Sequence, residues 1–188
     1  MRIIAGELRS RIVEMVPGET TRPTLDRIKE SIFNRIGPYF DGGLMLDLFG
    51  GSGNIGFEGI SRGVDKCIFV DVNNVPIQTI KKNAATLKVQ DKCRILKMDY
   101  MDALKLFASE NLKFDFVYID PPYAKQQIDV IMEFLDEHDL INSEGLIVCE
   151  SGIEDSFKEE YGKLYKSHDK EYRVTRVTIY RRKDDENE

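Results

Sequence analysis

The sequence is poor in the residues that build metal centres and disulfide frameworks. Its 188 residues include three cysteines and two histidines, and no Cys-x-x-Cys pair. Cys67, Cys93 and Cys149 lie far apart in apolar stretches, where a free cysteine behaves as a small hydrophobic residue. We therefore expect free thiols, no zinc site and no other metal.

Long hydrophobic runs are absent as well. No apolar run approaches the roughly 18 residues of a membrane span, and the first fifteen residues lack the apolar segment of a secretory signal. We expect a cytoplasmic protein without a membrane partner. The length fits one domain over 1–183, with an N-terminal extension and helix over 1–40, a core over 41–183 and a disordered tail over 184–188.

The net charge of −6 argues against a nucleic-acid partner, but the charge is uneven. Residues 1–35 carry seven basic against five acidic side chains, and residues 163–183 carry eight against two. If these two segments meet in space, they could form a phosphate-binding face. The alternative is two solvated basic segments without a partner.

Short apolar runs alternate with helical patterns through the middle of the chain. Strands are expected at 44–49, 67–72, 93–97, 114–119 and 146–149, and most of these runs are almost continuously apolar, as strands covered on both faces are. Apolar residues recur at helical spacing over 77–87 and 128–135. This alternation predicts an α/β fold with a parallel sheet.

The two flanks of this core have patterns of their own. Ile28, Ile32 and Ile36 predict an amphipathic helix that begins with Thr24 as its N-cap. Residues 3–13 are expected to form a small β element. Toward the other end, 163–166 and 172–182 are predicted to be an antiparallel pair of strands at the sheet edge.

A glycine-rich loop is the strongest backbone signal. Gly51, Gly53 and Gly56 fit the pattern Gly-x-Gly-x-x-Gly between a strand and a helix, and Asp71 ends the next strand. Such a loop lets a nucleoside-containing cofactor approach the backbone, while the acid accepts hydrogen bonds from ribose hydroxyls. Asp47, just before the loop, disfavours a pyrophosphate and suits the ammonium group of S-adenosylmethionine.

The tetrad Asp120-Pro121-Pro122-Tyr123 follows the fourth expected strand and indicates the chemistry. An exocyclic amine of a nucleobase is a poor nucleophile because its lone pair is delocalised into the ring. The Asp120 carboxylate and the Pro121 carbonyl can accept hydrogen bonds from this amine and direct its lone pair, while the prolines stiffen the turn. Tyr123 can stack on a base flipped out of its helix.

With these motifs, nearly the whole chain resembles the RsmD-type methyltransferases, which methylate N2 of a guanine in 16S ribosomal RNA. Further matching segments are Met1–Gly6, Arg22-Pro23-Thr24, Asp26-Arg27, Lys29-Glu30, Phe33-Asn34 and Leu46–Phe49. The resemblance implies a Rossmann-like sheet of seven strands, mostly parallel with an antiparallel last strand, and S-adenosylmethionine as cofactor. It also implies 16S rRNA as partner, within a partly assembled small ribosomal subunit. Arg173 stands where the family usually has glycine.

The resemblance also assigns the site. The implied cofactor-binding residues are Arg22, Thr24, Asp47, Phe49, Gly50, Gly51, Ser52, Gly53, Asp71, Val72, Asp99 and Tyr100. Arg9, Arg11 and Arg27 are the expected RNA contacts, and Lys29 is either a further phosphate or cofactor contact or part of a solvated helix face.

Other functions are compatible with parts of this pattern. The acceptor could be N6 of adenine in DNA or RNA, or a glutamine side chain, because related tetrads occur with these substrates. A non-catalytic RNA-binding protein is an alternative from another class, although it would not need Asp47, Asp71 and Asp120 together. A NAD-dependent dehydrogenase is disfavoured because no residue suggests hydride chemistry.

Overall fold

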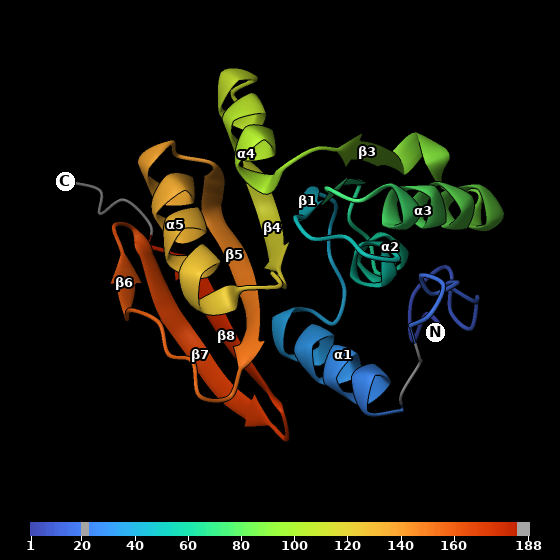
Figure 1. Ribbon diagram of the computed structural model, residues 1–188, viewed down its shortest axis with the longest axis horizontal. Coiled ribbons are helices and arrows are strands. Elements are labelled where there is room, and N and C mark those ends of the chain that lie inside the picture. Colours follow the sequence, from blue (N-terminus) through green and yellow to red (C-terminus); the bar gives the residue numbers. More distant parts are fainter. Residues whose placement is uncertain (20–22, 184–188) are drawn as a thin grey trace. The chain divides into compact units, whose positions relative to one another are not determined.

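A computed structural model describes residues 1–19 and 23–183, except for the side chains of Pro23 and Thr24. The chain forms two compact units, the first over Met1–Tyr100 and the second from Met101 onward. Strands and helices alternate along it, coloured from blue to red in Figure 1. The single domain over 1–183 stays a prediction, and the tail at 184–188 lies outside the described residues.

Three parallel strands form the sheet of the first unit, in the order β3-β2-β1. They are β1 (Leu44–Asp47), β2 (Lys66–Asp71) and β3 (Cys93–Lys97). Leu44 lies opposite Lys66 in the first pair, and Cys67 lies opposite Cys93 in the second. The predicted strands are recovered, but β1 ends two residues before Phe49 because the chain already turns there.

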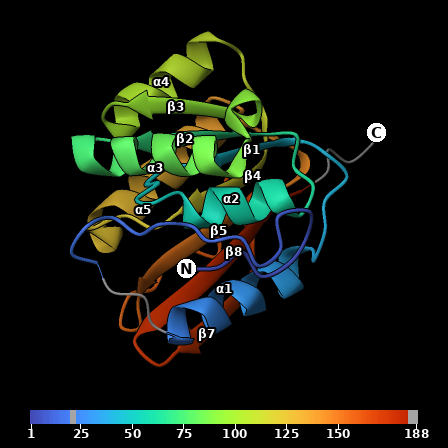
Figure 2. The ribbon, with the colours of Figure 1, turned by 90° about the vertical axis from the view of Figure 1, so that its right-hand side faces the viewer.

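The helices of this unit are α1 (Pro23–Ile36), α2 (Asn54–Ser61), α3 (Asn74–Leu87) and the short 3-10 helix η1 (Gln90–Lys92). Helix α4 (Tyr100–Ser109) begins at the last residue of this unit and continues into the second. Contacts join α2 to β1 and β2, and α3 to β2 and β3, as Figure 2 shows. Ile77, Ile80, Ala84 and Leu87 of α3 are buried, which confirms the predicted amphipathic face.

Helix α1 has the buried face that its isoleucines predict, since Ile28, Ile32 and Ile36 are all buried. Its start corrects one prediction: the helix begins at Pro23, so Thr24 lies in the first turn and is not the N-cap. Proline suits the first helical position because the missing N–H has no partner there. The β element expected over 3–13 is reduced to one antiparallel bridge between Arg2 and Ile12.

The second unit has five strands in the order β4-β5-β8-β7-β6. They are β4 (Phe114–Ile119), β5 (Ile141–Gly152), β6 (Glu160–Tyr161), β7 (Leu164–Tyr172) and β8 (Thr175–Arg182), with helix α5 (Ala124–Glu137) packed against β5. β4 and β5 are parallel, whereas β8 pairs antiparallel with both β5 and β7. The predicted mostly parallel α/β fold with antiparallel C-terminal strands is confirmed. The two-residue strand β6 brings the described strands to eight, one more than predicted.

The β7–β8 hairpin turns at Arg173 and Val174. Arg173 has a φ of +45°, in the left-handed region that favours glycine. Val174 is 77% exposed at the tip. This turn lies where the chain departs from the family pattern, and the backbone keeps the conformation that a glycine would adopt more easily.

Candidate active site

The glycine loop of the first unit connects β1 to α2. Gly51 and Gly53 have φ values of +58° and +84°, which side chains rarely adopt. No atom lies within 4 Å of the position that a Gly51 Cβ would take, so this part of the loop is open. At Gly53 a Cβ would lie 2.5 Å from the Phe57 ring. The loop therefore combines a packed side with an open side where a ligand can approach the backbone.

Asp71 fixes this loop from the end of β2. Its Oδ2 accepts the Gly51 N–H at 3.1 Å, and its Oδ1 accepts the Asn73 N–H at 2.9 Å. The side chain is only partly buried, so lone pairs of the same oxygens can still meet a hydroxyl. Val72, the next residue, is 59% exposed. The predicted positions on β2 thus lie at the carboxyl end of the sheet, beside the loop.

Asp47 ends β1 and is buried. Its Oδ2 accepts the Gly56 N–H at 3.2 Å, in the first turn of α2. A carboxylate at a helix N-terminus is stabilised by the unpaired N–H groups and the helix dipole. Asp47 therefore holds the start of α2 and places negative charge next to the end of the glycine loop.

An aromatic pair lies next to these acids. The rings of Phe49 and Tyr100 are 5.4 Å apart between centroids. Tyr100 begins α4 directly after the exposed Asp99, and the Met98 N–H donates to the Asp71 carbonyl at 3.1 Å. The structure thus brings Phe49, Asp71 and Tyr100 to one end of the first sheet, as the sequence predicts.

Asn83 supports the loop and was missed by the sequence analysis. This buried α3 residue donates from Nδ2 to the Ser52 and Glu14 carbonyls, both at 2.9 Å, and accepts the Glu14 N–H at 2.9 Å. Ser52 is itself buried, with its Oγ 3.8 Å from the Met15 sulfur. Asn83 therefore fastens residues 14–15 onto the glycine loop. A lone asparagine in a helix gives no sequence signal for such a role.

The tetrad of the second unit lies at the carboxyl end of β4. Asp120 follows the last strand residue, Pro121 is buried, Pro122 is exposed, and Tyr123 is 68% exposed immediately before α5. The Tyr123 N–H donates to Gln127 Oε1 at 3.0 Å. The Tyr123 ring is therefore open to a flat partner while its backbone is held.

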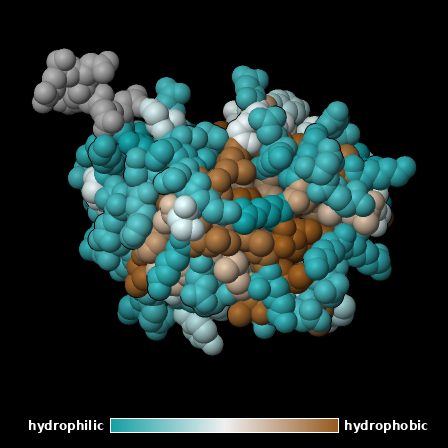
Figure 3. All heavy atoms as spheres, turned by 90° about the horizontal axis from the view of Figure 1, so that it is seen from above, coloured by the Kyte–Doolittle hydropathy of each residue, from teal (hydrophilic) through white to brown (hydrophobic). Residues whose placement is uncertain are grey.

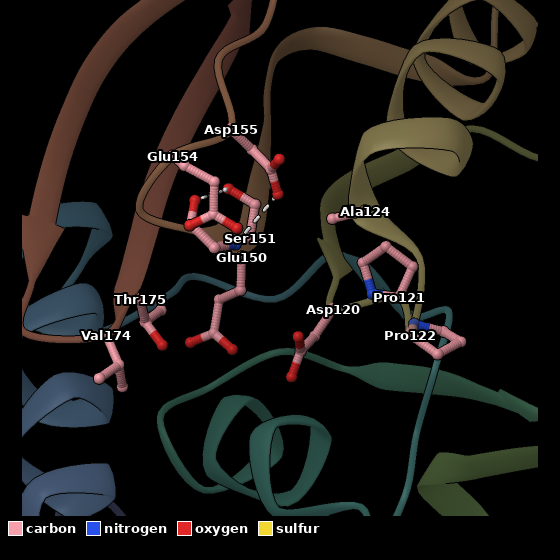
Figure 4. A pocket seen from close by; sticks show the side chains of 11 residues that line it. Asp120, Pro121, Pro122, Ala124, Glu150, Ser151, Glu154, Asp155, Val174 and Thr175 are labelled. Carbon is pink, nitrogen blue, oxygen red and sulfur yellow. Dashed lines mark hydrogen bonds between the residues drawn. The ribbon is translucent and has the colours of Figure 1, made fainter.

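A pocket of about 380 Å³ opens beside the tetrad. Figure 4 shows the side chains that line it. They are Asp120, Pro121, Pro122, Ala124, Glu150, Ser151, Gly152, Glu154, Asp155, Val174 and Thr175, all from the second unit. Three chain segments thus form the walls: the end of β4, the end of β5 with the loop after it, and the tip of the β7–β8 hairpin.

Asp120 and Glu150 point into the same part of this pocket (Figure 4). Asp120 is open to solvent, yet protein atoms surround it closely in the concave site. This partial burial, the charge of Glu150 and a hydrogen-bonding contact with Glu150 raise the pKa of Asp120 well above its usual range. Two neighbouring carboxylates without a cation between them hold a shared proton more tightly. Glu150 lies within β5, two residues before its end, whereas Asp120 directly follows the last residue of β4.

The basic residues proposed for RNA contact differ in their exposure and contacts. Arg9, Arg11 and Arg27 are exposed, and Arg11 Nη2 donates to the Thr86 carbonyl at 2.8 Å. Arg22 and the Thr24 side chain lie outside the described residues. Both predictions for Lys29, a phosphate or cofactor contact and a solvated helix face, are wrong. The residue is 2% exposed, so it neither contacts a partner nor belongs to a solvated face.

Lys29 instead forms a buried ion cluster with Glu58 and Arg62. Its Nζ lies 3.0 Å from Glu58 Oε1, and Arg62 Nε lies 2.8 Å from Glu58 Oε2. Glu58 also accepts the N–H groups of Ile4 at 2.9 Å and Ala5 at 3.2 Å. This cluster joins α1, α2 and the N-terminal segment.

Several basic residues of the C-terminal strands are already paired with acids. Arg176 contacts Asp169 at 2.7 Å and Glu171 at 2.6 Å, and Arg182 contacts Asp139 at 2.8 Å. Lys166 and Lys183 pair with Glu159 and Glu160, at 3.2 Å and 2.6 Å. Asp169 and Glu171 are already counted in the +6 balance over 163–183, so the three acids outside this segment, Asp139, Glu159 and Glu160, neutralise half of it. Figure 3 shows one face of the surface, where hydrophilic residues surround an apolar area.

Among the helices of residues 1–19 and 23–183, none has both the length and the apolar composition that a membrane span requires. Over the same part of the chain, no three His, Cys, Asp or Glu side chains are grouped so that they could hold a metal ion. The acidic residues of the pocket are thus not arranged as a metal centre.

Comparison with known proteins gives the family. Residues 1–181 match the family described as "Conserved hypothetical protein 95". A Bacillus subtilis protein named "Putative rRNA methyltransferase YlbH" is 41% identical over 183 residues, covering 97% of this chain and 100% of the relative. "Ribosomal RNA small subunit methyltransferase D" of Haemophilus influenzae is 34% identical and covers 80% and 78%.

A solved structure confirms the fold. The Escherichia coli protein titled "Putative methyltransferase yhhF" superposes with a TM-score of 0.84 at 29% identity, covering 98% of this chain and 99% of that one. Together with the match over residues 1–181, this likeness confirms the resemblance on which the site was assigned. The chain belongs to the family described as "Conserved hypothetical protein 95", the family of RsmD-type methyltransferases.

Proposed function

We propose that this protein transfers a methyl group from S-adenosylmethionine to N2 of a guanine in 16S ribosomal RNA. The observation that carries the proposal is the Asp120–Tyr123 tetrad at the end of β4, with Asp120 on the wall of an open pocket and Tyr123 exposed beside it. The name of the Haemophilus influenzae relative, a small-subunit rRNA methyltransferase, supports the choice of RNA.

The first unit offers residues that fit the cofactor. The glycine loop is open at Gly51, where no neighbouring atom fills the Cβ position, and Asp71 and Asp47 place carboxylates next to it. Asp71 would accept hydrogen bonds from the ribose hydroxyls, and the negative charge of Asp47 would favour the ammonium group of the methionine end. When bound, S-adenosylmethionine supplies an electrophilic methyl group on a positively charged sulfur.

The second unit offers residues that fit the acceptor. Tyr123 would stack on the flipped base, at a gain of about 1–3 kcal/mol. Asp120 would accept a hydrogen bond from the exocyclic amine and direct its lone pair toward the methyl carbon. Transfer of the methyl group, with its S–C bond replaced by the new N–C bond, would leave the nitrogen positively charged, and Asp120 would accept the proton that the nitrogen then loses. Such positioning by a hydrogen-bonding base contributes typically 10²–10⁴-fold to a rate.

Labelled methyl transfer tests the proposal. Purified protein is incubated with tritiated S-adenosylmethionine and partly assembled small subunits from cells that lack the enzyme, and the modified nucleoside is identified by mass spectrometry. Asp120→Asn is compared with Glu133→Gln, which removes an exposed charge on α5. The expected product is N2-methylguanosine. Its rate of formation should fall by at least about 10²-fold in Asp120→Asn and stay unchanged in Glu133→Gln. Methylated adenine or methylated protein would refute the proposal, and so would cofactor binding without transfer to any RNA.

A further inference from the structure

The pocket beside the tetrad holds a second carboxylate whose position is fixed by strand pairing. β4 and β5 run parallel, and Ile119 lies opposite Cys149 in their register. Asp120 and Glu150 come directly after this pair, so they lie at the same level: Asp120 just beyond the end of β4, and Glu150 still within β5, opposite Val177 of β8. Figure 4 shows the two side chains extending into one part of the pocket.

The charge of the pocket restricts what it can bind. Four of its lining residues are acids, and among the described residues no lysine or arginine lines it. A phosphate or carboxylate ligand would meet only repulsion from these groups. A neutral ligand that presents several N–H donors on one edge would be favoured, because carboxylates are pure hydrogen-bond acceptors when ionised.

The two acids on the other wall are engaged elsewhere. Asp155 Oδ2 accepts the Gly152 N–H at 3.2 Å. The Glu154 carboxylate lies over Gly152, with Oε1 2.7 Å from the position of a Cβ. In Figure 4 both side chains lie beyond Ser151, on the side away from Asp120. Glu150 is therefore the acid that shares a ligand with Asp120.

Purines differ at the edge that such a pair would contact. Guanine presents two adjacent kinds of donor, the N1–H and the N2 amine, whereas adenine presents an amine next to an acceptor nitrogen. An enzyme that flips a base reads this edge by hydrogen bonds. An acceptor nitrogen placed against an ionised carboxylate leaves two buried acceptors facing each other, which is unfavourable.

We propose that Glu150 accepts the N1–H of the target guanine while Asp120 accepts a proton of its N2 amine, so that Glu150 selects guanine among the bases. This assignment rests on the proposed function and names a specificity residue for it. Because Asp120 and Glu150 repel each other when both are ionised, a partner that offers one N–H donor to each favours the doubly ionised pair. Glu150 thereby couples recognition of the base to the ionisation of the Asp120 carboxyl group.

The test uses a base that keeps the reacting N2 amine but lacks the adjacent N1–H donor. The guanine mapped by the labelling experiment is replaced, in otherwise identical 16S rRNA assembled into subunits, by 2-aminopurine. This base has the same N2 amine, but its N1 is an acceptor. The wild-type enzyme is expected to methylate guanine at least about 10²-fold faster, because sites that hydrogen-bond a substrate group reject analogues lacking it strongly.

Substitution of Glu150 should reverse part of this preference. Glu150→Gln offers an amide N–H to N1 of 2-aminopurine, so we expect it to slow guanine methylation at least 10-fold and to bring the two rates within 10-fold of each other. Glu154→Gln, which removes the same charge from the other wall, should keep the wild-type ratio. S-adenosylmethionine binding by calorimetry, unchanged in both variants, shows that they are folded.

The outcomes separate the two proposals. Guanine methylation with equal wild-type rates on both bases, or an unchanged ratio in Glu150→Gln, overturns the role of Glu150 and leaves the proposed function standing. A shift of the ratio in Glu154→Gln as large as in Glu150→Gln shows a general charge effect and also overturns it. Methylation of adenine N6 in place of guanine N2 refutes both the proposed function and the role of Glu150. In that case the carboxyl beside N1 would have to be protonated and donate to the adenine N1, instead of accepting a proton from guanine.

Discussion

Replacing Glu58 by glutamine should destabilise the first unit more than any exposed ion pair could. Glu58 is fully buried and accepts from four donors: the Lys29 ammonium, the Arg62 guanidinium and the Ile4 and Ala5 amides. Glutamine keeps the shape, but its amide nitrogen is a donor and must face one of these donors. Removing one partner of a buried ion pair costs about 3–5 kcal/mol, since the other charge stays buried.

The measurement is urea unfolding, with hydrogen exchange of the Ile4 and Ala5 amides to locate the effect. We expect a loss of about 3–5 kcal/mol in Glu58→Gln, faster exchange at both amides, and less than about 1 kcal/mol in the exposed control Glu133→Gln. Adding Lys29→Met to Glu58→Gln should cost less than the sum of the two single changes, because the unpaired ammonium is removed. A loss in Glu58→Gln as small as that in the control would refute the assignment.

The stabilisation by Glu58 should also depend on pH. Burial acts to raise the pKa of Glu58, but Lys29, the Ile4 amide and Arg62 outweigh it, and the pKa lies below its usual value. A group whose pKa is lower in the folded state stabilises above its unfolded pKa. The difference between wild type and Glu58→Gln should therefore be full at neutral pH. It should shrink as the pH falls through the unfolded pKa of glutamate, near 4.3, toward the lower folded one.

Three further predictions concern the two sites. Because the crowded pocket and Glu150 raise the pKa of Asp120, kcat/KM should fall as the pH drops through a value above the usual aspartate range. Glu150→Gln should move this limb to lower pH, and an unmoved limb would contradict the coupling. Tyr123→Ala should lower kcat/KM about 5- to 150-fold without changing the urea midpoint, since the ring is 68% exposed; a stability loss would indicate a packing role instead. Gly53→Ala should lower the free energy of unfolding by about 1–3 kcal/mol, because the backbone there is left-handed and the new Cβ would clash with the Phe57 ring. Gly51→Ala, with open space around it, should cost less stability and mainly weaken S-adenosylmethionine binding by calorimetry; the reverse order would contradict the assignment of the open side.

The sequence predicted best what depends on continuous burial. β4 has the predicted bounds because its largely buried run is bordered by Lys113 and Asp120. β3 also has the predicted bounds, although its residues are only partly buried or exposed. β5 begins at Ile141, earlier than the predicted Leu146, because its pairing with β4 is irregular and polar residues occupy the first part. β6 has two residues, which is too short for any pattern.

The site residues that were missed depend on contacts between distant segments. Lys29 has the sequence surroundings of an exposed helix residue, and its partner Glu58 lies on another helix. Glu150 carried a usable signal, an acid directly after the strand predicted over 146–149, but the use of that signal depended on knowing that β5 pairs with β4. Asn83 forms its hydrogen bonds with backbone atoms of Ser52 and Glu14, so the residue types at those two positions do not indicate the contact.

The buried Glu58 cluster has a consequence for the order of events during synthesis. The Ile4 amide and its acceptor on Glu58 are 54 residues apart in the chain. At translation rates of about 5–20 residues per second, the N-terminal segment waits roughly 3–10 s before its acceptor has been made. Until then the Lys29 ammonium has no carboxylate to neutralise it and stays in water. The first residues of the nascent chain therefore cannot reach their buried acceptor until α2 has been made, although they are the first to leave the ribosome.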